Sequence, residues 1–329
     1  MFPFTFIKAK NNKEAITAAA NNTGTKFIGG GTNIVDLMKM NIEKPPQLVD
    51  ITSLGLKKIE VLSNGNILIG ALVKNSDLAY DATITSKYPM LSKALLSGAS
   101  PQLRNMATTG GNVLQRTRCY YFFDTAMPCN KREPGSGCSA IKGYNRMHAV
   151  LGTSSSCIAT HPSDMCVAMA ALDAIVHVEG INGERSINFL DFHLLPGDTP
   201  EKENVLQQGD LITSIEIPSL PFASNSTYIK VRDRASYEFA LASAAVALEV
   251  SGGTIKNARI ALGGVATKPW RAKEAEQYLI GKSAGTETYK AAASVALKDA
   301  TTYPYNSFKP ELAKRTLISA LQNTGGNNE

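Results

Sequence analysis

The chain has 329 residues, of which 43% are hydrophobic and 19% are charged, and its formal net charge is +6. This length predicts about two domains, because a single hydrophobic core rarely grows beyond roughly 250–300 residues. The composition is ordinary for a globular protein and excludes disordered, collagen-like and coiled-coil architectures.

The first half of the chain predicts short helices and strands in alternation. The predicted helices are 12–20, 34–40 and 76–97, the last broken at Pro89, and the predicted strands are 25–28, 47–51, 57–61 and 66–73. A further helix is expected to begin at residue 164, where Ser163 can cap its free N–H groups.

The second half predicts a hairpin and then a separate domain. The predicted strands are 174–179, 185–187, 211–217, 228–232, 242–250 and 256–262, and the predicted helices are 270–279, 287–299 and 309–321. Strands followed by helices favour an α+β domain. The segment 218–226 is expected to be a linker, and the tail 323–329 is expected to be frayed.

Membrane and export signals are not evident in the sequence. The longest near-apolar stretch, 165–178, is interrupted by Asp173 and His177, so we expect no transmembrane helix. The first ten residues, MFPFTFIKAK, have neither a basic n-region nor a long apolar h-region, and we expect no signal peptide of the chain's own.

Two glycine-rich loops are candidates for phosphate binding. The first, KFIGGGTN at 26–33, lies between a predicted strand and a predicted helix, where backbone N–H groups can surround an anion. The second is TTGGN at 108–112. Neither is a P-loop or a GxGxxG sequence. Each could also be a simple tight turn, but two such loops together favour a shared pyrophosphate.

Four of the five cysteines lie in a stretch rich in turn-forming residues. They are Cys119, Cys129, Cys138 and Cys157. No apolar periodicity would hold such a long excursion together, so we expect a fastener. A [4Fe–4S] cluster, a structural zinc ion, two disulfides and unrelated core residues all remain open. Cys166 lies in a predicted helix and is expected to be a small core residue.

Positive charge is concentrated around the same cysteines. Residues 101–150 contain seven basic and two acidic side chains, so this segment carries +5 of the net +6. Such a concentration favours an anionic ligand, cluster or partner.

Taken together, these motifs resemble a known family. KFIGGGTN, TTGGN, HPSDM, GDLITSIEIP and YIKVR occur in the order found in FAD-binding medium subunits of the xanthine dehydrogenase family of molybdenum hydroxylases. The four-cysteine insert is similar to that of FAD/[4Fe–4S] subunits of bacterial periplasmic aldehyde oxidoreductases. The resemblance covers nearly the whole chain.

The resemblance implies an α+β fold with a vanillyl-alcohol-oxidase/PCMH-type FAD-binding domain. This domain would span 1–220, with subdomains of about 1–55 and 56–220 and the insert at about 115–158. A C-terminal α+β domain like that of carbon monoxide dehydrogenase flavoproteins would span 226–325.

The resemblance also implies the residues that bind FAD. In the two loops these are Lys26, Phe27, Ile28, Gly29, Gly30, Gly31, Thr32, Asn33, Ile34, Thr108, Thr109, Gly110, Gly111 and Asn112. Elsewhere they are Thr160, Asp164, Ile212 and Lys230. The four cysteines of the insert would ligate the [4Fe–4S] cluster. We assign no catalytic acid or base to this chain, because the flavin performs the redox chemistry.

The implied function is electron transfer within an aldehyde oxidoreductase heterotrimer. A large subunit would carry the molybdenum cofactor that oxidises aldehyde to carboxylic acid. A small subunit would pass electrons from [2Fe–2S] clusters to the FAD, which would reduce an external acceptor. We expect no nucleic-acid partner. The alternatives are a self-contained FAD oxidoreductase and a zinc-stapled scaffold module. The resemblance implies export to the periplasm with a signal-bearing partner, and a cytoplasmic location is the alternative.

Overall fold

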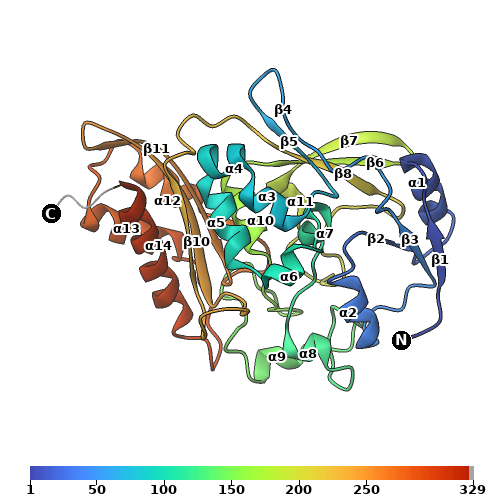
Figure 1. Ribbon diagram of the computed structural model, residues 1–329. Helices are drawn as coiled ribbons and strands as arrows, with labels where there is room; N and C mark the ends of the chain where they lie inside the picture. The colour runs from blue at the N-terminus through green and yellow to red at the C-terminus, as the bar shows by residue number, and fades with distance from the viewer. Residues whose placement is uncertain (326–329) are drawn as a thin grey trace.

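The computed structural model describes residues 1–325, which form three sheets with helices packed around them (Figure 1). Residue 1 and the helix over residues 309–325 lie on opposite sides of the molecule. Within residues 1–325, no helix is long and apolar enough to cross a membrane.

The N-terminal part is a small parallel sheet with the strand order β1-β3-β2. Its elements are β1 (Thr5–Lys8), α1 (Asn12–Ala20), β2 (Lys26–Ile28), α2 (Ile34–Lys39) and β3 (Gln47–Asp50). Parallel strands need crossover connections: α1 connects β1 to β2, and α2 connects β2 to its neighbour β3. The turn from β2 into α2 contains the first glycine loop.

The second part is a five-stranded antiparallel sheet with the order β4-β5-β8-β6-β7. Its strands are β4 (Ile59–Val61), β5 (Ile67–Gly70), β6 (Ile175–Gly180), β7 (Gly183–Asn188) and β8 (Leu211–Ile217). Its helices are α3 (Asn75–Tyr80), α4 (Ala82–Lys87), α5 (Pro89–Ser97), α6 (Pro101–Arg104), α7 (Thr109–Val113), α10 (Asp164–Ala171) and α11 (Phe189–Phe192). α10 is buried along its whole length, so its pattern is apolar all round rather than amphipathic.

The four-cysteine insert has little regular structure. Its helices are the single turns α8 (Tyr120–Phe123) and α9 (Ser139–Lys142), which lie together at one edge of the molecule (Figure 1). Polar contacts hold the loops between them. Arg132 donates to the carbonyls of Tyr121 and Phe122, both at 2.8 Å, and Asn130 donates to the Ser156 carbonyl at 3.0 Å.

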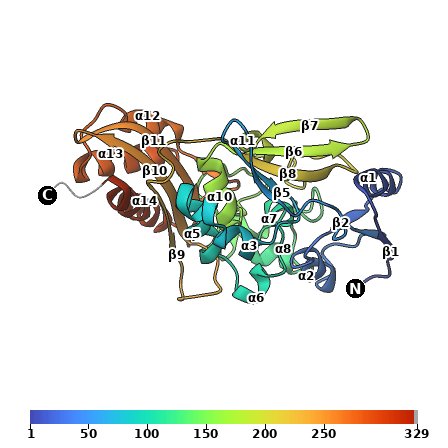
Figure 2. The same ribbon diagram turned by 45° about the horizontal axis from the view of Figure 1, so that its top comes forward.

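The C-terminal part is a four-stranded antiparallel sheet with the order β12-β11-β10-β9, covered on one side by three helices. Its elements are β9 (Ser226–Val231), β10 (Ala242–Ser251), β11 (Thr254–Gly263), β12 (Trp270–Arg271), α12 (Lys273–Leu279), α13 (Thr286–Ala296) and α14 (Lys309–Gly325). α5 and α10 of the second part contact β9, β10 and β11. These two helices therefore lie between the two larger sheets (Figure 2).

Most of the predicted elements are confirmed, and the differences are these. The predicted break at Pro89 is confirmed, since α5 begins there, but a second break lies at Asp81, which ends α3 and caps α4 through its side chain. The short helices α6, α7, α8, α9 and α11 were not predicted. The helix predicted over 270–279 begins only at Lys273, since residues 270–271 form β12. The prediction missed β1, and the frayed tail is wrong for 323–325, which belong to α14. Residues 326–329 lie outside the described part of the chain.

Packing of α14 on the C-terminal sheet gives a direct test of the fold. Leu317 is fully buried in the cluster that α14 forms with β10 and β11. Leu317→Ala should lower the free energy of unfolding by about 3 kcal/mol, because it leaves a cavity in a close-packed interior. Chemical unfolding of the wild-type and variant chains measures this, with exposed Ser294→Ala on α13 as the control. Equal losses of unfolding free energy in Leu317→Ala and Ser294→Ala would contradict the packing of α14 on the C-terminal sheet.

Candidate functional site

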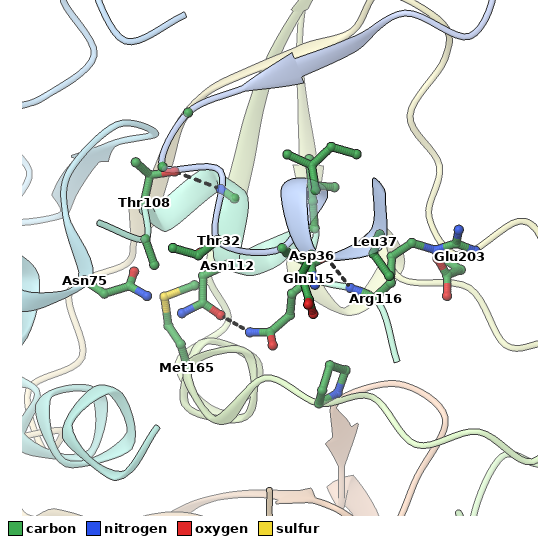
Figure 3. Close-up of a pocket in the computed structure, with 18 of the residues that line it drawn as sticks. Thr32, Asp36, Leu37, Asn75, Thr108, Asn112, Gln115, Arg116, Met165 and Glu203 are labelled. Atoms are coloured by element: carbon green, nitrogen blue, oxygen red, sulfur yellow. Dashed lines mark hydrogen bonds and ion pairs between the residues drawn. The ribbon is translucent and has the colours of Figure 1, made fainter. Parts of the chain in front are cut away.

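A large cavity of about 1080 Å³ lies where the three parts of the chain meet. Its wall is built by the β2–α2 loop, the end of α5, the start of α7, the start of α10, the segment 201–210, β9 and the loop after β9. Segments far apart in sequence therefore converge on one hollow (Figure 3).

The first glycine loop forms one wall and requires glycine for a steric reason. A Cβ atom on Gly30 would lie 2.0 Å from the carbonyl oxygen of Met106, which is far inside van der Waals contact. Gly31 has a φ of 75°, a conformation that side chains disfavour. The absence of side chains thus lets this backbone approach both the neighbouring segment and a ligand.

Unpartnered polar atoms in the wall fit an elongated polar ligand. Asn33 Nδ2 and Asn75 Oδ1 are buried, have no hydrogen-bond partner among the described residues, and belong to residues that line the cavity. Figure 3 shows the Asn75 side chain pointing towards Met165. A buried polar atom without a partner is costly, so a ligand with donors and acceptors would satisfy both.

The second glycine loop contributes only part of its predicted residues. Thr108 caps α7 by accepting from Gly111 N–H at 3.4 Å, and Asn112 accepts from the Ser163 hydroxyl at 2.7 Å. Thr108, Gly111 and Asn112 line the cavity. Thr109 and Gly110 do not line it, because their N–H groups bond to the carbonyls of Val73 and Ala71.

Asp164 and Lys230 face the cavity as an ion pair. Lys230 Nζ lies 2.8 Å from Asp164 Oδ2, and Tyr228 donates its hydroxyl to Asp164 Oδ1 at 2.5 Å. Burial and the Asp164 charge raise the pKa of Tyr228 well above its usual range. Since Asp164 begins α10 and Lys230 lies on β9, the pair also joins the second part of the chain to the C-terminal part.

Besides Thr109 and Gly110, three further predicted residues lie outside the cavity wall. Ile28, Thr160 and Ile212 do not line the cavity. The Thr160 hydroxyl donates to the Met147 carbonyl at 3.3 Å, inside the cysteine insert. Ile212 is buried in the core of the second part. The remaining predicted residues, Lys26, Phe27, Gly29 to Ile34, Thr108, Gly111, Asn112, Asp164 and Lys230, all line the cavity.

An ion network in the wall was missed from sequence. Arg116 contacts Glu43 and Glu203, both at 2.5 Å, and Lys131 lies 2.9 Å from Glu203. Burial would raise the pKa of Glu203, but the charges of Arg116 and Lys131 outweigh it and lower that pKa. The concentration of basic residues at 101–150 was the feature of the sequence that indicated an ion network. The acidic partners could not be paired with them, because they come from distant segments.

The four cysteines of the insert converge on a second, small cavity. Cys119, Cys129, Cys138 and Cys157 all line it, and Cys129 and Cys138 face each other across an isolated β-bridge. All are free thiols, as is Cys166, which is buried in α10. Burial raises the pKa of Cys119 to about 12 and that of Cys157 to about 11, so metal binding here would displace protons.

Comparison with known proteins identifies the chain. Residues 2–220 match the family described as the FAD binding domain in molybdopterin dehydrogenase. The chain belongs to this family. Residues 227–322 of this molybdopterin-dehydrogenase flavoprotein match the CO dehydrogenase flavoprotein C-terminal domain.

Curated relatives extend over the full length of the flavoprotein. It is 50% identical over 323 residues to the aldehyde oxidoreductase FAD-binding subunit of Escherichia coli (strain K12), covering 98% of both chains. It is 29% identical to the glyceraldehyde dehydrogenase medium chain of Sulfolobus acidocaldarius, over 89% of this chain and 88% of that one.

Solved structures share the fold. Quinoline 2-oxidoreductase from Pseudomonas putida 86 gives a TM-score of 0.76 at 24% identity, covering 99% of this flavoprotein and 98% of that chain. Carbon monoxide dehydrogenase from Hydrogenophaga pseudoflava also gives 0.76 at 24% identity, over 98% of both chains. The chain therefore shares its fold with these two solved chains.

The close approach at Gly30 predicts a loss of flavin on substitution. In Gly30→Ala the new Cβ would collide with the Met106 carbonyl, so the loop must move away from the cavity. We expect the purified variant to contain at least tenfold less FAD per chain, equivalent to about 1.4 kcal/mol of binding. The control is Gly55→Ala, where a Cβ meets nothing within 4 Å. Full flavin content in Gly30→Ala would contradict the role of this loop.

The ion network predicts a pH-dependent stability. Glu203→Gln should lower the free energy of unfolding at pH 7 by about 1–3 kcal/mol, because Arg116 and Lys131 lose their shared anion. The folded-state pKa of Glu203 is depressed below 4.5, so its contribution is present above that pH and is lost as pH falls through the folded value.

The difference between wild type and Glu203→Gln should therefore shrink in acid. Thermal unfolding at pH 7 and below pH 4.5 measures it, with exposed Glu287→Gln as the control. A difference that stays constant across this range would show that Glu203 does not act through its charge.

Proposed function

We propose that this chain is the FAD-binding, electron-transferring subunit of a molybdenum-containing aldehyde oxidoreductase. The observation that carries the proposal is the 50% identity, across 98% of both chains, to an aldehyde oxidoreductase FAD-binding subunit. The cavity lined by both glycine loops is the place in this chain where such a cofactor fits.

The residues of the cavity fit FAD. Gly29 to Asn33 would hold the pyrophosphate through backbone N–H groups at the start of α2, which needs no basic side chain. Thr108, Gly111 and Asn112 would form the second phosphate contact, and the Asp164–Lys230 pair would face the ribityl or adenosine part. Bound FAD supplies redox chemistry that exchanges electrons singly or in pairs. The protein positions it and excludes water.

The substrate chemistry belongs to partner subunits in this proposal. Oxidation of aldehyde to carboxylic acid would take place at a molybdenum cofactor in a large subunit, and [2Fe–2S] clusters in a small subunit would deliver electrons to this chain. Several relatives are named as medium chains or medium subunits, which supports a heterotrimer. An external acceptor would receive the electrons.

The four cysteines of the insert are proposed to hold a [4Fe–4S] cluster. In a zinc site, bonds of about 2.3 Å hold thiolate sulfurs roughly 3.8 Å apart. In the described chain, no three of these four sulfur atoms lie within 4.8 Å of one another. Four free thiols that line one small cavity are the donor set that a [4Fe–4S] cluster requires.

The proposal predicts the colour and iron content of the complex. Purified anaerobically with its partners, it should show flavin bands on a broad, reducible brown absorbance. Cys138→Ser should remove the iron in excess of the partner's [2Fe–2S] clusters and leave FAD in place. The exposed Ser294→Ala on α13 is the control, because Ser294 lies outside the cysteine cavity.

Other results would favour the alternatives. Flavin bands with zinc but no excess iron would support a zinc-stapled insert. Aldehyde turnover by the isolated chain would support a self-contained FAD oxidoreductase. A folded chain without colour would overturn the proposal.

Export of this chain with a signal-bearing partner stays a prediction. Co-expression with and without the partner subunits, followed by fractionation, tests it. The chain should reach the periplasm only when the signal-bearing partner is present.

A further inference from the structure

His148 lies against one of the four cysteines of the insert. Its Nε2 atom is 3.1 Å from Sγ of Cys119, and the residue is only 2% exposed. Its other ring nitrogen, Nδ1, is buried and has no hydrogen-bond partner among the described residues. Nε2 is therefore the ring atom through which His148 makes its polar contact.

The backbone of His148 is held from the C-terminal part of the chain. Lys309, at the first residue of α14, is fully buried. Its Nζ donates to the carbonyls of His148 at 3.0 Å, Met147 at 3.2 Å and Gly264 at 2.5 Å. Asn306 donates a further bond to the His148 carbonyl at 3.4 Å. By donating to these three carbonyls, Lys309 fixes the position of the turn that contains His148.

A side-chain donor distinguishes Cys119 from Cys157. The Cys157 sulfur accepts from the backbone N–H of Ala159 at 3.4 Å, a donor that side-chain substitution leaves in place. The contact to Cys119 comes from an imidazole, which can be exchanged without altering the main chain. Hydrogen bonds to ligand sulfurs stabilise the more negative, reduced state of a cluster and raise its reduction potential.

We propose that His148 donates its Nε2–H to the Cys119 sulfur and raises the reduction potential of the cluster, and that Lys309 is the positioning residue that holds His148 in place. This inference rests on the proposed [4Fe–4S] site. It assigns a redox function to two residues that do not ligate iron, and it makes the cluster potential depend on α14.

Two substitutions of similar size separate donation from packing. In His148→Gln the new side chain would keep an amide N–H at a comparable reach, whereas in His148→Met it would fill the space without a donor. The experiment compares these two variants in the intact complex. A redox titration followed by electron paramagnetic resonance gives the potential, and iron and FAD contents are measured on the same samples.

We expect His148→Met to shift the cluster to a more negative potential and His148→Gln to retain the wild-type value, with FAD content unchanged in both. Loss of excess iron in His148→Met alone would overturn the effect on potential, because it would show that His148 is needed to retain the cluster instead. A wild-type potential in His148→Met, or an equal shift in both variants, would overturn the proposal.

Lys309→Met extends the test to the positioning residue. It should shift the potential in the same direction as His148→Met, and an unchanged potential in a folded, flavin-containing Lys309→Met variant would overturn the positioning role. The comparison of His148→Gln with His148→Met remains a valid test whether or not Lys309→Met folds. Absence of excess iron in the wild-type complex would instead count against the proposed [4Fe–4S] site itself.

Discussion

The close backbone contact between the first glycine loop and the Met106–Ala107 segment is the constraint on which the cofactor cavity depends. It brings the N-terminal sheet against the second part of the chain, and it leaves no space for a Cβ at Gly30. The opposite side of the contact is itself fixed. Lys74 donates to the Met106 carbonyl at 2.9 Å, and the Asn75 N–H donates to the Ala107 carbonyl at 2.9 Å. Two loops far apart in the sequence thus become two walls of one site.

The cysteine insert is held mainly by polar contacts. Its apolar support is small, since Phe122 and Cys129 pack with Leu37 of α2 in a minor cluster. Hydrogen bonds and ion pairs replace a hydrophobic core there, and they run to neighbouring parts of the molecule. Arg116 joins the insert to the cavity wall, and Lys309 joins it to the C-terminal helix. The insert and the cavity lined by the glycine loops therefore share structural supports.

Predictions from the sequence were correct where the structure depends on residues that are close together in the chain. The cap at Ser163 is present, because its hydroxyl accepts from the Cys166 N–H at 3.1 Å. Strand β1 was missed for the opposite reason. Its side chains are mostly exposed, so it shows no buried face, and it is a strand because it pairs with β3. Asp81 is a typical N-cap residue, so the sequence contained a signal for the break between α3 and α4. The continuous apolar pattern around it led to the prediction of a helix that runs through Asp81.

The sequence by itself determined the two glycine loops, the set of four cysteines, the order of the main helices and strands and the family to which the chain belongs. These follow from local residue chemistry and from motif order. Only the tertiary structure decided which of those residues meet. It placed Thr160 and Ile212 away from the cavity, paired Asp164 with Lys230, joined Arg116 to acidic partners, and set His148 against Cys119. The reason is that these contacts join segments that are distant in the sequence. A single sequence does not state which distant residues lie close together in the folded chain.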